Sequence, residues 1–492
     1  MIIVKIATQK RLERLGFVGK KKDKIRIRFI GENSEDVTGS ETLIEMPGYQ
    51  VLLECGLYQS SNMKRDYKIN SRRLDYRPSD IDYIFLNHLH IDHSGKICRL
   101  YANGCRARII APKGSKELFK VMCTDSAYIM SKDSETLSRK YNMSANPIYT
   151  IKDVDEALKY FDEYDFEETI KLNDGVSFRF IPSGHIINSA QLELWLTDGN
   201  HTSKILYTSD LGNLSIPKYY SDVFTPVYHS NIVIGECTYG DAIRSANEKD
   251  REKDLEKIKS IVETVCVQNN HRVLIPIFAL DRAQNILTHL YDLFGADETF
   301  NVPILIDSPL TIQITNLYSK LLKGESLKKF EKVLQWNNIK FVNEYEESQM
   351  WRNKKDPCVC LSASGFMQAG RSRQWAKTLL PDSKNHIIFV GYSSPDSLAG
   401  RIKNGKAHKT VSIDGKPVPN RCGITNLLSF SSHMQHDGLL SYYSNINAEK
   451  ICLVHGETKG KIMFGKELQD EISRKNKTSK VVIVNRGTEI LL

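Results

Sequence analysis

The sequence lacks long runs of apolar residues. Its most apolar stretches, such as "HIIFVGY" and "NIVIG", are far shorter than the roughly 20 residues that a membrane-spanning helix needs. The start, "MIIVKIATQKRLERLGFVGKKKDK", also has no sustained apolar segment of the kind found in a secretory signal. These absences argue against a membrane or secreted protein, and we expect a cytoplasmic protein with no membrane partner.

Cysteine is scarce and irregularly spaced. Ten cysteines among 492 residues do not form a disulfide framework, and their number fits a reducing compartment. Cys358 and Cys360, in "DPCVCLSAS", would share one face of a strand. A lone C-x-C pair is weak evidence for a metal, so we expect both thiols in a hydrophobic core. The chain also shows no internal repeat and no low-complexity segment.

Positive charge is concentrated at the start of the chain. The formal net charge is +9, and residues 1–28 carry ten Lys or Arg against Glu13 and Asp23, which is +8. The remaining chain is therefore near neutral. We expect a basic arm over residues 1–24. It could hold a polyanion such as RNA or be a solvated tail, and the sequence does not decide between the two.

The pattern of apolar residues divides the rest of the chain into three parts. A chain of 492 residues exceeds the size of a single hydrophobic core. Residues 25–216 are rich in strands, with a helix expected from Ser115 to about Lys140. Residues 217–402 alternate apolar strands with amphipathic helices, which predicts a parallel sheet covered on both faces. Residues 403–492 return to strands around one helix.

The stretch "NHLHIDHSGK", residues 87–96, contains the densest group of metal-binding residue types. Imidazoles and a carboxylate drawn together lose hydration unless they share a partner. His88 and His90 are two positions apart at the end of a predicted strand, so both project to the same side. Asp92 and His93 follow in the turn and can face a second ion. Zinc suits this set of nitrogen and oxygen ligands.

Two more candidate ligands stand where apolar runs end. His185 follows "FRFIPSG", and Asp210 follows "KILYTS". In each case one ligand-type residue lies beside small residues at the end of a predicted strand. A catalytic zinc site needs more ligands than one loop supplies, and these two positions extend the set.

The motif H-x-H-x-D-H, with an isolated His and an isolated Asp downstream, resembles the metallo-β-lactamase fold. "GECTYGD" is similar to the signature that opens the β-CASP insertion, and "FSSH" and "LVHGE" match its later motifs. With "IPIFALDRAQ", "IDSPLT", "SASGFMQAGR" and "GYSSPDSLAGR", the resemblance covers residues 24–492. It implies an α/β protein, with an αββα metallo-β-lactamase sandwich over residues 25–216 and 403–492. A β-CASP domain, a parallel sheet flanked by helices, would be inserted at residues 217–402.

The resemblance also implies which residues bind metal. Two zinc ions per chain would be held by seven side chains, with His88, His90 and His185 on one ion, Asp92, His93 and His455 on the other, and Asp210 bridging them. Two zinc ions about 3.5 to 4 Å apart can share a hydroxide that attacks a phosphodiester. Asp92 would orient this hydroxide. His433, beside Glu236, would protonate the leaving 3′ oxygen, giving 3′-hydroxyl and 5′-phosphate ends.

The expected substrate is single-stranded RNA, because family members with a histidine at the position of His455 act on RNA. The substrate contacts expected from the motifs are Ser364, Gly365, Arg401 and Ser431. The chain resembles the compact bacterial and archaeal relatives of the pre-mRNA 3′-end endonuclease more than the exonucleases called RNase J. We therefore expect an RNA-processing endoribonuclease, and the sequence leaves a homodimer open.

Four alternatives stand beside this prediction: a 5′-3′ exoribonuclease, a DNA nuclease of the same family, a noncatalytic RNA-processing scaffold and a small-molecule metallo-hydrolase. A scaffold would be expected to lose ligands, and a small-molecule hydrolase leaves the inserted domain without a purpose. Three positions depart from the family pattern: Glu54 stands where the family has Asp, Asn188 replaces Gly and Gln435 replaces Asp. These departures put the fine geometry and the rate in question more than the class of reaction.

Overall fold

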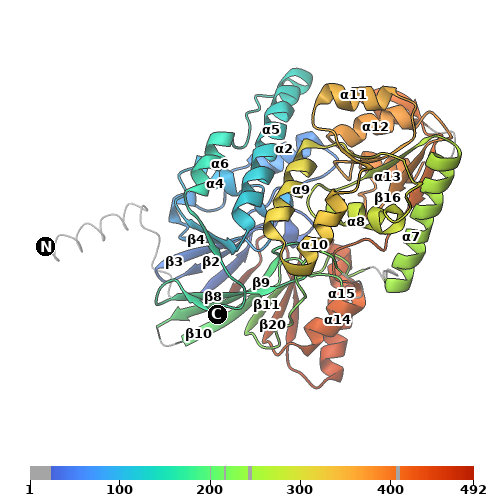
Figure 1. Ribbon diagram of the computed structural model, residues 1–492. Helices are drawn as coiled ribbons and strands as arrows, with labels where there is room; N and C mark the ends of the chain where they lie inside the picture. Colours follow the sequence, from blue (N-terminus) through green and yellow to red (C-terminus); the bar gives the residue numbers. More distant parts are fainter. Residues whose placement is uncertain (1–23, 200, 215–217, 242–246, 406–409) are drawn as a thin grey trace.

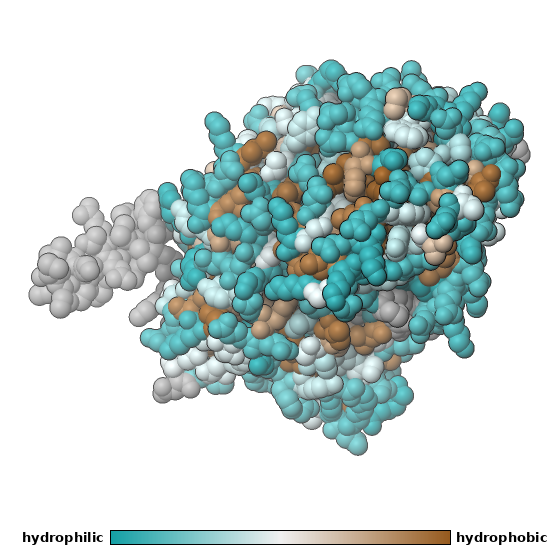
Figure 2. Space-filling model, viewed as in Figure 1, coloured by the Kyte–Doolittle hydropathy of each residue, from teal (hydrophilic) through white to brown (hydrophobic). Residues whose placement is uncertain are grey.

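The computed structural model describes residues 24–199, 201–214, 218–241, 247–405 and 410–492 (Figure 1). The basic arm expected over residues 1–24 therefore lies outside the described residues, apart from Lys24. None of the described helices is both long enough and apolar enough to cross a membrane. The surface in Figure 2 is mostly hydrophilic, with apolar residues in small groups.

Two seven-stranded sheets pack face to face and form a sandwich (Figure 1). The first has the order β22-β1-β2-β3-β4-β5-β6. Its strands are β1 (Arg26–Phe29), β2 (Thr42–Met46), β3 (Tyr49–Leu53), β4 (Tyr83–Phe85), β5 (Arg108–Pro112), β6 (Phe161–Tyr164) and β22 (Glu489–Leu491). The second has the order β21-β20-β11-β10-β9-β8-β7. Its strands are β7 (Ile170–Lys171), β8 (Val176–Pro182), β9 (Ala190–Asp198), β10 (His201–Tyr207), β11 (Ile232–Glu236), β20 (Lys450–Val454) and β21 (Lys480–Ile483).

Alternating apolar residues of both sheets fill the space between them. Phe29, Phe85, Phe178, Leu194 and Tyr207 belong to this single buried cluster. The outer face of the first sheet packs on a second apolar cluster with α2 (Met63–Ser71), α4 (Ile97–Ala102), α5 (Ser115–Tyr141) and α6 (Ile151–Leu158) nearby, and short α3 (Ile91–Ser94) precedes α4. The outer face of the second sheet packs on α14 (His436–Asn445) and α15 (Thr458–Arg474). The order of layers is helix, sheet, sheet, helix.

A six-stranded parallel sheet forms the inserted domain, with the order β14-β13-β15-β12-β16-β19. Its strands are β12 (Arg272–Pro276), β13 (Ile304–Ile306), β14 (Ile339–Phe341), β15 (Cys358–Ser362), β16 (His386–Phe389) and β19 (Gly423–Asn426). The helices are α7 (Glu248–Val262), a π-helical turn at Glu263–Gln268, α8 (Arg282–Phe294), α9 (Pro309–Leu321), α10 (Gly324–Leu334), α11 (Tyr345–Asn353), α12 (Arg371–Leu379) and α13 (Leu398–Lys403). Apolar clusters lie on both faces of the sheet, and a hairpin of β17 (Thr410–Ile413) and β18 (Lys416–Pro419) packs on one of them.

The predicted fold class is confirmed, and several local expectations are met. The helix expected from Ser115 is α5. The structure also shows a capping box of Thr150 and Asp153 at the start of α6. All ten cysteines are buried free thiols. Cys358 and Cys360 both belong to the apolar cluster on one face of the inserted sheet, as expected.

Strand pairing refines the division into domains. β11 lies within the expected insertion 217–402, yet it pairs with β10 and β20 of the second sandwich sheet. β19 lies after residue 402, yet it pairs with β16 of the inserted sheet. We therefore propose that the inserted domain begins after β11 and ends after β19.

Candidate metal centre

The candidate metal centre lies at one edge of the sandwich, where several strands end. β8, β10, β11 and β20 run in the same direction, because β8 and β10 both pair antiparallel with β9, and β10, β11 and β20 pair in parallel. Their ends lead to His185, Asp210, Glu236 and His455 respectively. In the facing sheet, parallel β3 and β4 end just before Glu54 and His88. Ligand-type residues far apart in sequence therefore meet at one edge.

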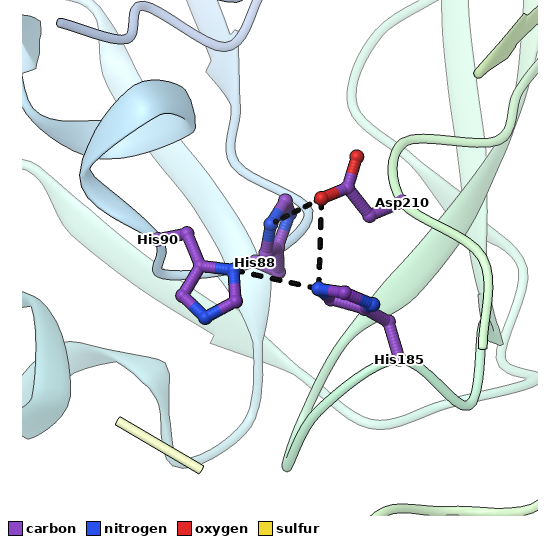
Figure 3. A group of neighbouring side chains, drawn as sticks. All are labelled: His88, His90, His185 and Asp210. Carbon is purple, nitrogen blue, oxygen red and sulfur yellow. Dashed lines mark hydrogen bonds and ion pairs between the residues drawn. The ribbon is translucent and has the colours of Figure 1, made fainter. Parts of the chain in front are cut away.

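The first group of donors is His88, His90, His185 and Asp210, shown in Figure 3. Nε2 of His88 lies 3.3 Å from Oδ2 of Asp210, and Nε2 of His185 lies 3.5 Å from the same oxygen. Nδ1 of His90 is 3.4 Å from Nε2 of His185. The three rings and the carboxylate thus point toward one another from three separate chain segments.

The second group is Asp92, His93 and His455. The Nε2 atoms of His93 and His455 are 3.1 Å apart, and Oδ2 of Asp92 lies 3.5 Å from Nε2 of His455. Oδ1 of Asp210 is 3.4 Å from Nε2 of His93. Asp210 therefore faces the first group with Oδ2 and the second group with Oδ1, which is the arrangement expected of a bridging carboxylate.

Contacts from a surrounding layer of residues turn the Nε2 atoms of three histidines inward. Nδ1 of His93 is 2.5 Å from Oε2 of Glu54, and Nδ1 of His88 is 3.1 Å from Oγ of Ser209. Nδ1 of His455 is 2.9 Å from Oγ1 of Thr238. Such contacts fix the tautomer and ring orientation of metal-binding histidines.

The donor atoms fit a cation better than they fit one another. An Nδ1–H bonded to the Glu54 carboxylate leaves His93 with a lone pair on Nε2, and that lone pair faces Nε2 of His455. Among the described residues, Nε2 of His88 and Oδ1 of Asp210 are buried without a hydrogen-bond partner, and both face the donor groups. Buried polar atoms without partners are costly, and a bound metal ion would satisfy them.

The charges of the metal-free groups follow from their burial and neighbours. Burial and the nearby His88 lower the pKa of His90 to about 3, so its ring is neutral and can donate a lone pair. Burial alone would lower the pKa of His88, but the carboxylates of Asp210 and Glu54 raise it to about 10. Burial would raise the pKa of Asp92, but the nearby His93 and His455 lower it to about 2. Metal binding must therefore displace a proton from His88, and affinity should fall at low pH.

The expected proton donor lies beside the two groups. Nδ1 of His433 is 3.4 Å from Oε1 of Glu236 and 3.9 Å from Oδ2 of Asp210, and its side chain is 21% exposed. The buried Glu236 carboxylate accepts hydrogen bonds from the backbone N–H groups of Leu211 (2.7 Å) and Thr238 (3.2 Å). The carboxylate is therefore held in place beside Nδ1 of the His433 ring.

The four expected substrate contacts lie in two parts of the chain, Ser431 after β19 and the other three within the inserted domain. Ser431 stands two residues before His433, and its Oγ lies 2.7 Å from the hydroxyl of Tyr239. Ser364, Gly365 and Arg401 have their contacts within the inserted domain, with Ala369, Phe278 and Asp396 respectively.

Glu54, which departs from the family pattern, forms several of the hydrogen bonds that surround the two donor groups. Its Oε2 also accepts hydrogen bonds from Tyr207 Oη (2.6 Å) and Ser40 Oγ (2.8 Å), and its Oε1 accepts one from Ser209 Oγ (2.7 Å). Its backbone is left-handed, with φ 59°. Sequence reasoning did not identify Ser40, Tyr207, Ser209 and Thr238. Of these four residues, only two could have been found from the sequence: Ser209 stands beside Asp210, and Thr238 lies within the motif "ECTYG".

The other two departures have local structural roles. Asn188 has φ 57°, a conformation that glycine adopts most easily, so the change from glycine leaves an amide side chain against Gly114. Gln435 precedes α14, and its Nε2 donates a hydrogen bond to the carbonyl of His433 at 3.1 Å. Gln435 therefore supports the backbone of the residue that we expect to donate a proton.

Glu54→Gln is expected to weaken metal binding by about 10- to 100-fold while the fold is retained. The amide keeps the size of the carboxylate but cannot accept the same charge-assisted hydrogen bond from His93. Chelator competition would measure the affinity. Glu193→Gln is the matched control, because Glu193 is another buried glutamate, paired with Arg179 and Lys204 in the second sheet. Equal metal affinity in the two variants would contradict the role of Glu54.

The sandwich, the inserted sheet and the histidine–aspartate edge define a metallo-hydrolase of the metallo-β-lactamase fold. Two family models match the chain: the Beta-Casp domain at residues 283–402 and the Zn-dependent metallo-hydrolase RNA specificity domain at residues 417–481. These matches confirm the resemblance to the β-CASP family that the sequence motifs predicted.

Three relatives match most of the chain. A ribonuclease of Thermus thermophilus is 29% identical, over 88% of this chain and 94% of its own length. A transcription termination factor of Methanocaldococcus jannaschii is 25% identical, over 88% of this chain and 67% of its own. An endoribonuclease of Eremothecium gossypii is 24% identical, over 89% of this chain, which spans 56% of that longer protein.

Proposed function

We propose that this protein is a zinc-dependent ribonuclease that cuts single-stranded RNA internally and leaves 3′-hydroxyl and 5′-phosphate ends. The observation that carries the proposal is the convergence of seven nitrogen and oxygen donors into two groups that share Asp210, with the His433–Glu236 pair beside them. The RNA specificity domain and the relatives described as a ribonuclease and an endoribonuclease support RNA as the substrate.

The proposed ligands are those expected from the sequence, with His88, His90 and His185 on one ion, Asp92, His93 and His455 on the other, and Asp210 between them. Two zinc ions held there would supply an attacking water of lowered pKa and would stabilise charge on a phosphate oxygen. The carboxylate of Asp92, whose side chain is 20% exposed, can orient the attacking water.

His433 would act as the general acid. Its Nδ1 faces the Glu236 carboxylate, which can accept a hydrogen bond from Nδ1–H and fix the orientation of the ring. In this orientation Nε2 lies on the opposite side of the ring from Glu236 and can give its proton to the leaving 3′ oxygen. Ser431 and the exposed Arg401 are the proposed contacts to flanking phosphates, with Ser364 and Gly365 at the inserted domain.

Cleavage of matched substrates tests the proposal. The zinc-reconstituted protein is expected to cut single-stranded RNA that is labelled at either end, and to give internal fragments from both labels. A ladder that grows from the 5′ end alone would indicate an exonuclease, and equal cleavage of DNA would indicate a nuclease without sugar preference. Binding of RNA without cleavage would indicate a scaffold. No interaction with either nucleic acid would favour a small-molecule hydrolase and overturn the proposal.

A further inference from the structure

A row of exposed apolar side chains lines one edge of the inserted domain. β12, β16 and β19 are neighbouring parallel strands, so their carboxyl ends lie at the same edge of the sheet. Phe278, Tyr392 and Leu428 each stand two or three residues beyond the end of one of these strands. Their exposed fractions are 40%, 38% and 39%. Neighbouring strands lie about 5 Å apart, so the row spans about 10 Å.

Packing within the inserted domain supports the row. Phe278 lies against Phe366, which follows the next strand, β15, with ring centroids 5.0 Å apart in an edge-to-face arrangement. A side chain at Gly365 would bring a Cβ within 3.1 Å of the Phe278 ring, so glycine leaves room for the ring at this position. The ring is thus fixed on one side and exposed on the other.

The row leads to the residue proposed as the general acid. His433 lies in the segment after β19 that also carries Leu428. The loop that carries Phe278 continues into Asp281 and Arg282, and both approach Ser432, the residue before His433. Oδ2 of Asp281 is 3.5 Å from Oγ of Ser432, and a guanidinium nitrogen of Arg282 is 3.4 Å from the same atom.

We propose that Phe278, Tyr392 and Leu428 form a stacking row that holds unstacked bases of single-stranded RNA beside His433. This inference rests on the proposed ribonuclease function and extends it to the placement of the substrate. Exposed large apolar side chains that gather at one edge of a domain mark a site of interaction. Aromatic faces bind bases of any sequence, and cations in the same surface bind the phosphates between them. The loop that carries Phe278 leads to contacts with Ser432, next to His433, and Arg401 stands exposed in α13 after Tyr392.

Binding of a short fluorescent single-stranded RNA tests the row. Measurements use the zinc-loaded His433→Ala protein, so that the RNA is not consumed. Phe278→Ala and Tyr392→Ala are each expected to weaken binding by at least about five-fold, whereas Phe278→Tyr, which keeps an aromatic face, should bind like its parent. Tyr128→Ala is the matched control, because Tyr128 is exposed on α5 of the sandwich, outside the row. It should leave binding unchanged.

RNA with single abasic positions separates stacking from a merely structural effect. If Phe278 stacks on a base, one abasic position should weaken binding to the parent protein and have little further effect on Phe278→Ala. The row is overturned if the alanine variants bind like their parent, or if their losses are the same for every abasic RNA. The first result would leave the surface to a protein partner. In either case cleavage of RNA by the wild-type protein would still uphold the ribonuclease function, whereas its absence would refute that function separately.

Discussion

His433→Ala is expected to lower kcat for RNA cleavage by about 10²- to 10⁴-fold while the protein keeps its metal. The imidazole is the only group proposed to protonate the leaving oxygen, and it is not among the seven proposed ligands. Its ring lies against Glu236 and beside His185, with ring centroids 4.4 Å apart for the two histidines. Removal of the ring therefore removes the proton donor without removing a ligand.

Two measurements make this expectation specific to proton donation. Elemental analysis should give the wild-type metal content for His433→Ala. RNA with a better leaving group at the cleaved bond, such as a 3′-thio substitution that needs little protonation, should recover part of the lost rate. His201→Ala is the control histidine variant, because His201 is exposed at the opposite end of β10 from Asp210. A wild-type rate in metal-replete His433→Ala would refute the assignment.

The donor positions are predictable because each follows an apolar strand. "IDYIFLNH" contains β4 and leads to His88, and "KILYTSD" contains β10 and leads to Asp210. A run of apolar residues that ends at one polar residue predicts a strand whose end carries a functional group. Family resemblance supplied the pairing of these residues into two groups. The structure adds that Asp210 presents one oxygen to each group.

The surrounding contacts and the strand pairing are much harder to predict. Glu54 meets Tyr207 and Ser209 across more than 150 positions, and no local pattern encodes such a contact. The left-handed backbone at Glu54 also depends on the tertiary structure around it. β11 and β19 have ordinary strand sequences, and their local patterns do not show which sheet each joins.

Asp210→Asn is expected to lower metal affinity more than Glu54→Gln does. The amide keeps the size of the carboxylate but loses the negative charge that faces both donor groups, and its NH₂ would point toward one of them. Since loss of a residue that only supports a ligand costs 10- to 100-fold, loss of this ligand should lower metal affinity by at least about 100-fold. The rate should fall by at least about 10³-fold, because metal ions supply several kcal/mol of charge stabilisation.

Metal content and rate, measured together, distinguish this outcome from simple unfolding. Asp307→Asn removes another fully buried carboxylate, one that pairs with Arg371 and Trp375 in the inserted domain. That variant should lose thermal stability but keep its metal, whereas Asp210→Asn should lose metal while circular dichroism shows a folded chain. Excess zinc should restore metal to Glu54→Gln, in which all seven proposed ligands remain. It should not restore the rate of Asp210→Asn, because the amide of that variant still lacks the negative charge that faces both groups. A fully metallated, active Asp210→Asn protein would show that the two groups do not work as one centre.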